Sequence, residues 1–573
     1  MPENSNSVKL SDATLFNVIA EDCVPEHAVG AFRRLCALCT YEFHRAPAQR
    51  GITMPVSCYP FYFYLRSSVL LFNMKRVAFS EQVSGFPKLQ VGILLLIQVA
   101  QYTAELSTDC YIWHIIKSFH TAKAHDEVLK YIGYLAFADG APQVLTYIFW
   151  AFQAERFGRK PIMLTGLISL AFSMLLYGFG RKFYLIWIAK FAASLLNANH
   201  TLVRTALGEV TPSLNHQPLA FLTIPVSYFV GSWLGPLIGN NLITPWTGPP
   251  PADAPPDRRF IKVFPFALPN IVLAIILLST ALLTFLFFEE THPYLDHQAD
   301  RGLAFGNLIR EKLGLSSSKG SYSRKFATAN DGLVDGEDDI ELQDPTGAAE
   351  DSSAPVFATY SRPKLIQMII SHTLFGYLSA VFAKLADSYF TESLNKDSIG
   401  FPFMFKGGCG ISWVDLPVIV IRCLVVAIII TVIAVPLAAK YGAILGGYRV
   451  SLTSFIVTFF FLPLFVFVAP DVTGIPQSAY YGFLYVLLLA QNTFFLIGLA
   501  FAATLLNMHV SAEDRNIQTA IAMAAYAGMG YFGTMLTSWM RSLFNNLGLQ
   551  TIFWWLLALI SLFTLLHSRV IAN

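Results

Sequence analysis

Long apolar runs separated by short polar turns make up most of this chain. From Pro87 onward we expect membrane-spanning helices near 89–116, 129–152, 160–179, 182–208, 217–242 and 262–288. After a polar segment we expect six more, near 364–390, 412–439, 445–469, 477–505, 515–540 and 549–569. A helix needs roughly 20 apolar residues, at about 1.5 Å each, to cross a bilayer core. The pattern therefore predicts an all-α polytopic membrane protein with twelve transmembrane helices in two six-helix bundles.

The polar stretches set the predicted domain boundaries. They are an N-terminal extension at 1–85, a first bundle at 86–293, a linker at 294–362 and a second bundle at 363–573. The linker is charged and poor in apolar residues, so most of it is expected to be disordered. Its segment Leu303–Leu315 is amphipathic and is expected to lie on the membrane surface.

Composition agrees with a membrane protein. Of the 573 residues, 54% are hydrophobic and 13% are charged, whereas a soluble domain carries about twice that charged fraction. The apolar runs are continuous rather than alternating, which favours helices over a barrel. The net charge of +2 argues against a nucleic-acid partner. The first 20 residues are polar and mixed in charge, so the first span is expected to direct insertion in place of a cleavable signal.

The N-terminal extension contains Cys36-x-x-Cys39 followed by His44, a spacing that suggests zinc. A structural zinc site needs four ligands, and no second pair follows at a suitable spacing. We therefore predict no metal site and no cofactor, and interpret the cysteines as part of a short amphipathic helix. The apolar run Cys58–Met74 is interrupted by Arg66 and is short for a span, so a membrane-lying segment is expected there.

A cationic turn between the second and third spans gives the orientation. Arg156, Arg159 and Lys160 lie at its tip, and basic residues in short loops favour the cytoplasmic side. With an even number of spans, both termini are then cytoplasmic. The plasma membrane and the vacuolar membrane both remain open.

Several ionisable or polar residues fall inside the predicted spans, where a charge costs several kcal/mol. Glu105 and Asp109 are one turn apart on the first span, and Asp139 lies about 14 Å into the second. One hypothesis is a polar pathway that binds protons and substrate. The alternative is that these groups neutralise one another or lie near the interfaces. The candidate pathway residues are Glu105, Asp109, Asp139, Lys190, Asn197, Asn199, His200, Lys384 and Asp387, and Arg422 also lies within a span.

The cationic turn resembles the motif Gly-x-x-x-Asp-Arg-x-Gly-Arg-Lys of the major facilitator superfamily. The correspondences are Ala151 for the first Gly, Glu155 for Asp, and the matching residues Arg156, Gly158, Arg159 and Lys160. The carboxylate is suited to pair with a guanidinium and to cap a neighbouring helix, and the glycine permits a positive φ. The resemblance implies that this motif latches the two halves together on the cytoplasmic side.

Two further stretches resemble fungal drug:proton antiporters related to the zinc-induced facilitator-like group. Residues 197–209 resemble the fourth helix of that group, which adds Arg204 and Glu209 to the cytoplasmic motif. Residues 231–240 resemble the antiporter motif of the fifth helix, with Gly231, Gly235, Pro236 and Gly239 matching. Small residues four apart also let helices pack closely, so packing alone is one interpretation. The resemblance implies that the packing helix also takes part in the transport mechanism, and we expect both roles together without substrate contact. The segment Phe288–Pro293 ends the first half as in these relatives.

The resemblance implies a secondary active transporter, a monomer that moves a small organic solute, a drug or a metal chelate in exchange for protons. One departure puts the coupling in question: fungal relatives carry Arg-x-x-Glu-Pro where this chain has Gln98-x-x-Gln101-Tyr102. Glu105, one turn later, is a possible replacement. The alternative is a non-transporting receptor or scaffold on a degenerate facilitator fold. Catalytic motifs such as a P-loop or His-Glu-x-x-His are not found in the sequence, so we do not expect an enzyme.

Overall fold

The structure is a computed structural model, and it describes residues 79–119, 125–243, 264–292, 295, 300–312, 363–401, 403–412, 415–511 and 513–570. Some sequence predictions lie outside this part of the chain. They concern Cys36, Cys39 and His44, the apolar run 58–74, the linker beyond residue 312, and the side chain of Asp387.

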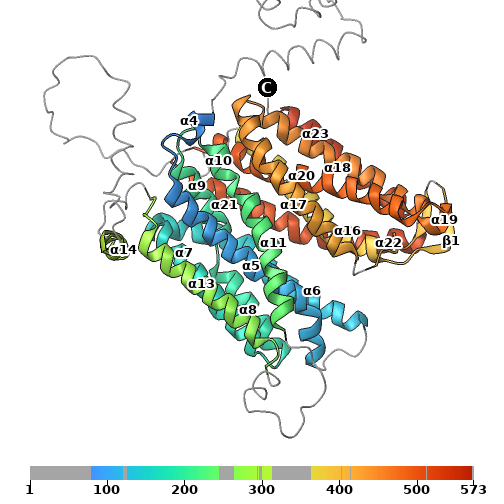
Figure 1. Cartoon of the computed structure of the whole chain (residues 1–573), viewed down its shortest axis with the longest axis horizontal. Coiled ribbons are helices and arrows are strands. Elements are labelled where there is room, and N and C mark those ends of the chain that lie inside the picture. Colours follow the sequence, from blue (N-terminus) through green and yellow to red (C-terminus); the bar gives the residue numbers. More distant parts are fainter. Residues whose placement is uncertain are drawn as a thin grey trace, which may run out of the picture. The chain divides into compact units, whose positions relative to one another are not determined.

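The first half of the chain forms helices at the predicted positions (Figure 1). They are α5 (Lys88–Ser118), α6 (His125–Phe157), α7 (Arg159–Phe179), α8 (Phe183–Leu196), α9 (Asn199–Val210), α10 (Gln217–Phe221), α11 (Thr223–Leu242) and α13 (Ala267–Phe287). The fourth predicted span is α8 followed by α9, and the fifth is α10 followed by α11. A short helix, α4 (Phe79–Val83), precedes them.

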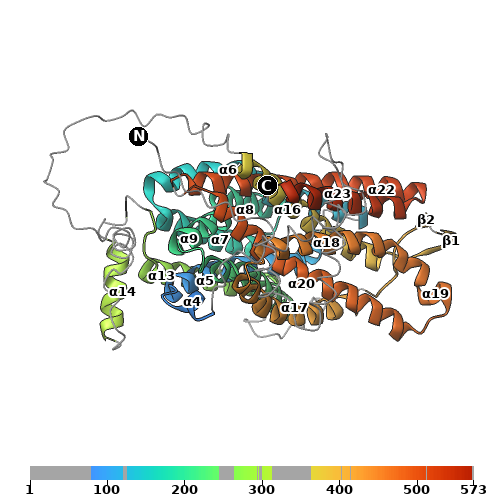
Figure 2. The ribbon, with the colours of Figure 1, turned by 90° about the horizontal axis from the view of Figure 1, so that it is seen from above.

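The second half repeats this plan. Its helices are α16 (Pro363–Thr391), α17 (Asp415–Lys440), α18 (Ile444–Phe461) with η2 (Leu462–Val468), α19 (Pro470–Thr473), α20 (Gln477–His509), α21 (Arg515–Gly528), η3 (Met529–Gly533), α22 (Thr534–Leu547) and α23 (Gln550–Val570). The sequence did not indicate the antiparallel pair β1 (Asn395–Gly400) and β2 (Met404–Lys406), which follows α16 in the chain and precedes α17. The pair lies near α19 (Figure 2). The sequence also missed η3, a π-helical turn that joins α21 to α22.

Nine helices in the described ranges are long and apolar enough to cross a membrane. The other three predicted spans differ for physical reasons. Helix α6 carries several charged residues, the fourth span is divided near Asn197, and the eleventh is divided by η3. The predicted all-α polytopic membrane fold is confirmed, with these three spans more polar or more broken than the rest.

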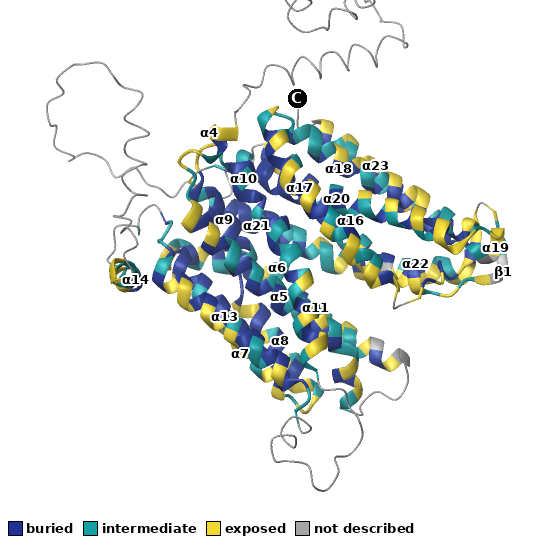
Figure 3. Ribbon diagram, viewed as in Figure 1, coloured by how far each residue is buried: buried dark blue, intermediate teal, exposed yellow. Residues whose placement is uncertain are grey.

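Burial follows the helix faces (Figure 3). Buried apolar side chains pack between neighbouring helices, whereas many large apolar side chains are exposed on the outer faces, such as Leu145, Ile433 and Phe563. Soluble proteins rarely expose large contiguous apolar surfaces. These outer faces are suited to lipid.

Glycines bring α11 against α5. A Cβ atom at Gly235 would lie 2.8 Å from the backbone nitrogen of Ser107, and one at Gly239 would lie 2.9 Å from its carbonyl oxygen. Gly231 faces Tyr102 in the same way, and Pro236 lies within α11. The residues of the antiporter-like motif are therefore placed for close packing of two membrane helices, as small residues four apart allow.

Helix α14 (Arg301–Lys312) forms within the amphipathic segment of the predicted linker. Figure 1 views α14 end-on and Figure 2 shows its length, so it runs crosswise to α7 and α13. Gly302 and Gly306 pack on the carbonyl oxygens at the end of α13, while Phe305 and Leu308 are exposed. An exposed apolar pair on a crosswise helix is suited to the membrane surface.

The glycine contact makes a direct prediction. Gly235→Ala adds a Cβ against backbone atoms that cannot move aside, so it is expected to lower the unfolding free energy by about 1–3 kcal/mol. Gly92→Ala on α5 is the matched control, because no atom lies within 4 Å of its added Cβ. Thermal unfolding of both purified variants provides the measurement. Equal stability of the two variants would contradict the close packing of α11 on α5.

Candidate functional site

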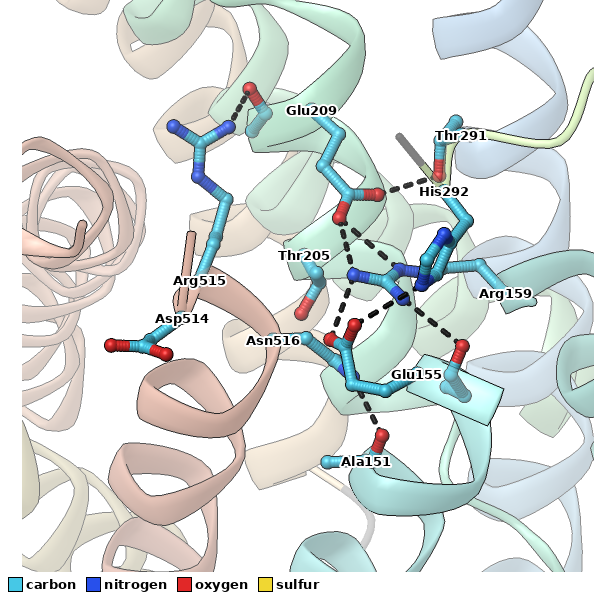
Figure 4. Close-up of polar contacts among 12 residues, drawn as sticks. Ala151, Glu155, Arg159, Thr205, Glu209, Thr291, His292, Asp514, Arg515 and Asn516 are labelled. Atoms are coloured by element: carbon cyan, nitrogen blue, oxygen red, sulfur yellow. Dashed lines mark hydrogen bonds and ion pairs between the residues drawn. The ribbon is translucent and has the colours of Figure 1, made fainter. Parts of the chain in front are cut away.

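A buried guanidinium organises the turn between α6 and α7 (Figure 4). The Nη2 atom of Arg159 lies 2.9 Å from Oε1 of Glu155 and 2.8 Å from Oε1 of Glu209, and Nη1 donates to the carbonyl oxygen of Ala154 at 3.0 Å. The cation thus joins the end of α6 and the end of α9 to the start of α7. We call this group the Arg159 cluster, and its members are Glu155, Arg159, Glu209, Glu290 and His292.

Glu290, which follows α13, caps α7. Its carboxylate accepts the backbone N–H of Arg159 at 2.8 Å and that of Lys160 at 3.0 Å. The sequence assigned this capping role to Glu155, and that assignment is corrected, because Glu155 instead faces Arg159 and His292. Gly158 is the single residue between the helices and has φ of 95°, which L side chains rarely adopt.

The segment after α13 completes the cluster. Thr291 donates its hydroxyl to Oε2 of Glu209 at 2.6 Å, and Nε2 of His292 lies 3.2 Å from Oε2 of Glu155. Sequence reasoning did not single out Glu290, Thr291 and His292 as site residues. The available signal was the segment Phe288–Pro293, which was noted only as the end of the first half.

The other basic residues of the turn have different surroundings. Lys160 is buried and pairs with Asp300, which also accepts the backbone N–H groups of Gly302 and Leu303 and so caps α14. Arg156 is exposed and lies over the ring of Phe157. The turn is therefore tied to α14 through Lys160, and Arg156 lies outside the Arg159 cluster.

Contacts near this cluster connect the two halves of the chain. Asn516 of α21 donates its amide to the carbonyl oxygen of Ala151 at 2.8 Å, and Arg515 donates to that of Gly208 at 2.6 Å (Figure 4). Both acceptors lie within one turn of a carboxylate that binds Arg159. In this structure the halves are joined on the side of the molecule that carries the α6–α7 turn.

The ionisable residues within the first-half spans form two groups. Glu105 accepts the amide of Gln101 at 2.9 Å and lies 3.2 Å from Nε2 of His200. Lys190 lies 3.9 Å from the carboxylate of Asp139 and donates to the hydroxyl of Thr108 at 3.2 Å. The structure therefore brings together four residues of the predicted pathway as two pairs, Glu105 with His200 and Asp139 with Lys190. It adds Gln101 to the first pair.

Other predicted pathway residues are placed elsewhere. Asp109 is exposed, and exposed Lys384 lies 5.1 Å from the ring of Tyr531. Asn197 accepts the backbone N–H of Asn199 at the break between α8 and α9, and both asparagines pack against Gly166 of α7. The two asparagines therefore line the α7 contact rather than joining Glu105.

One arginine of the predicted cytoplasmic motif differs from its expected place, whereas Arg422 lies within the predicted span. Arg204 was grouped with Glu209, but its Nη1 contacts Sδ of Met523 at 2.6 Å and its guanidinium lies 6.0 Å from the ring of Tyr526. It therefore lies apart from the Arg159 cluster. Arg422 is exposed on α17. In the described ranges, no group of three or more His, Cys, Asp and Glu residues is placed to hold a metal ion.

The two sets of membrane helices are joined by the contacts of Asn516 and Arg515 beside the Arg159 cluster, and the first set carries paired ionisable groups inside its spans. This arrangement is that of a polytopic membrane transporter of the two-bundle type. The model of the Major Facilitator Superfamily matches residues 94–419, which is more than half of the chain. This protein belongs to that superfamily, as the resemblance implied.

Individual proteins agree with this assignment. The "Major facilitator superfamily multidrug transporter mfsB" of Aspergillus fumigatus is 25% identical over 511 residues, 83% of this chain and 82% of that protein. "Protein ZINC INDUCED FACILITATOR 1" of Arabidopsis thaliana is 26% identical over 214 residues, 37% of this chain and 43% of that protein. The solved proton:xylose symporter XylE, at 12% identity, covers 84% of this chain and 95% of its own with a TM-score of 0.56. That likeness shows the fold.

Capping by Glu290 can be tested by stability. In Glu290→Gln, one amide oxygen replaces two charged acceptors at the start of α7, so the unfolding free energy is expected to fall by about 1 kcal/mol. Glu289→Gln is the matched control. Burial raises the pKa of Glu289, which means that the folded protein disfavours its charged form. Removing this charge is therefore expected to change the unfolding free energy little. Unfolding of both variants at neutral pH is the measurement. An equal loss of unfolding free energy in the two variants would contradict the capping role of Glu290.

Proposed function

We propose that this protein is a secondary active transporter that exports a small organic solute, a drug or a metal chelate in exchange for protons. The observation that carries the proposal is the contact between Glu105 and His200 inside the membrane helices, at 3.2 Å. Ionisable residues are costly there, and they commonly mark ion or proton pathways. Glutamate and histidine side chains commonly form proton relays in membrane transporters.

Gln101 supports the assignment of the proton site to Glu105. It occupies the position where fungal relatives carry the acidic residue of the first helix, and its amide donates to Glu105 at 2.9 Å. The carboxylate is thus present one turn further along the helix, with the residue at the family position as its hydrogen-bond donor. We infer that proton coupling moved along α5 rather than being lost.

The contacts between the halves beside the Arg159 cluster supply the gate in this proposal, and the cluster positions the helix ends that carry their acceptors. Opening toward the side of the α6–α7 turn, which is the cytoplasmic side in the proposed orientation, requires breaking the contacts of Asn516 and Arg515 with the first half. Alternating access then proceeds by rocking of the two bundles about a central site. The likeness to a multidrug transporter supports a drug or another small organic solute as the substrate. We further propose a monomer with both termini in the cytoplasm.

If Glu105 carries the coupled proton, Glu105→Gln is expected to lose the dependence of transport on the pH gradient. Purified protein in liposomes, with an imposed pH gradient, is assayed with ethidium, rhodamine 123 and fluorescein as probes. We expect wild type to move at least one probe faster with the gradient, and Glu105→Gln to lose this dependence because its side chain cannot bind a proton.

Glu311→Gln on α14 is the matched control, since Glu311 is exposed and outside the spans, and it is expected to behave as wild type. Gradient dependence that persists in Glu105→Gln would contradict this proton site. Absence of flux in wild type for every probe would favour the receptor or scaffold alternative.

The gate makes a separate prediction. Glu155→Gln removes one of the two carboxylates that bind Arg159, so the balance between the two access states is expected to shift and transport to slow about fivefold or more. Expression should change little, because Glu209 still pairs with Arg159. Arg156→Gln, a change at an exposed residue of the same turn, is expected to leave the rate unchanged. A wild-type rate in Glu155→Gln would remove the gating role.

A further inference from the structure

Arg204 is a buried cation at the contact between the two halves. It lies on α9, one turn after His200, and only 6% of its surface is exposed. Its two neighbours from α21 are Met523, whose sulfur lies 2.6 Å from Nη1, and Tyr526, whose ring centre lies 6.0 Å away. A thioether is a weak acceptor, and neither neighbour carries a negative charge.

The other lysine and arginine side chains that are buried in the described ranges are compensated. The buried residues Arg159, Lys160, Lys190 and Arg541 each lie in an ion pair with a carboxylate. Within the described ranges, Arg204 has no such pair, and its Nε atom is buried without a hydrogen-bond partner. A buried charge is stable only when it is paired or well solvated by polar groups. Arg204 therefore lacks the counter-charge that the other four have.

A second polar group lies beside it without partners. His372 of α16 has none of its surface exposed, and neither ring nitrogen has a hydrogen-bond partner among the described residues. Its ring centre lies 5.2 Å from that of Tyr526. Arg204 from the first half and His372 from the second thus both approach the ring of Tyr526, and both have unused hydrogen-bonding groups.

We propose that Arg204 and His372 bind the carboxylate of an aromatic organic acid, which lies between the two halves against the ring of Tyr526. A guanidinium offers a planar set of N–H donors that matches a carboxylate, and a neutral imidazole adds one more donor. The aromatic part of the solute packs on Tyr526 and on Tyr102, whose ring centre lies 5.0 Å from that of His200. This inference rests on the proposed function in one respect: it assumes that the protein carries a small organic solute.

The competing explanation is structural. Arg204 then serves only to hold α9 against α21, through its contact with the ring of Tyr526, as cation–π pairs do. The two explanations differ in what they predict for ligand charge. A structural arginine does not distinguish aromatic acids from aromatic amines, whereas a carboxylate site binds only the acids.

Binding to the purified full-length protein in detergent tests this difference. The probes are benzoate, 1-naphthoate and fluorescein, each compared with an amine of similar shape: benzylamine, 1-naphthylmethylamine and rhodamine 123. Affinity is measured from the concentration dependence of the thermal unfolding midpoint. We expect saturable stabilisation by at least one acid and none by its amine partner.

Three variants connect the result to the site. Arg204→Gln is expected to weaken acid binding about tenfold or more, as the loss of a charge-assisted hydrogen bond does. Arg204→Lys keeps the charge without the planar fork and is expected to retain part of the affinity, which also covers the case in which the glutamine variant fails to fold. Arg422→Gln makes the same exchange at an exposed position of α17 and is expected to bind as wild type.

Stabilisation by amines rather than acids, no stabilisation by any acid, or unchanged acid binding in Arg204→Gln would overturn the inference. An equal loss in Arg422→Gln would do so as well. The assay needs neither a bilayer nor a pH gradient, so loss of the proton-coupled flux leaves it standing. If instead the protein carries a cation in a proton-dependent manner and Arg204→Gln does not change this flux, the anion site is contradicted. The transporter function still stands in that case.

Discussion

A guanidinium that is removed from water needs acceptors on every side, and the arrangement around Arg159 follows from that requirement. Glu155 at the end of α6 and Glu209 at the end of α9 share its charge, and the carbonyl oxygen of Ala154 accepts a further N–H. Glu290, from the segment after α13, binds the backbone of the same residue. One side chain thus ties together the ends of several helices, and removing a partner would leave a buried charge uncompensated. The bonds that Asn516 and Arg515 make to the first half lie beside this group.

The same need for compensation explains the charges inside the spans. Glu105 is matched by His200 and Gln101, and Asp139 lies near Lys190. Such pairs lower the cost of placing ionisable groups in the membrane. Arg204 lacks a carboxylate partner in the described part of the chain, and this difference is the reason for assigning it an anionic solute.

The motif and local spacing made part of the site predictable. The motif that the α6–α7 turn resembles indicated that the carboxylate of Glu155 would pair with a guanidinium, and it pairs with Arg159. The contact of Gly235 with α5 followed from small residues four apart. Glu290 was missed as the cap of α7 because 131 residues separate it from Arg159, and no local pattern connects them. Arg204 was misplaced because resemblance grouped it with Glu209, although five residues along a helix point to different faces.

By itself, the sequence determined the membrane class, the positions of the spans and the cationic turn, because these depend on the length and polarity of continuous segments. Only the tertiary structure decided which charges meet. The partner of a charge depends on how each helix is rotated about its axis, where it is broken, as at Asn197 or η3, and which helix packs against it. Those features come from contacts between segments that are distant in the chain, so Arg159 acquired its full set of acceptors, and Arg204 its place beside Tyr526, only when the helices packed together.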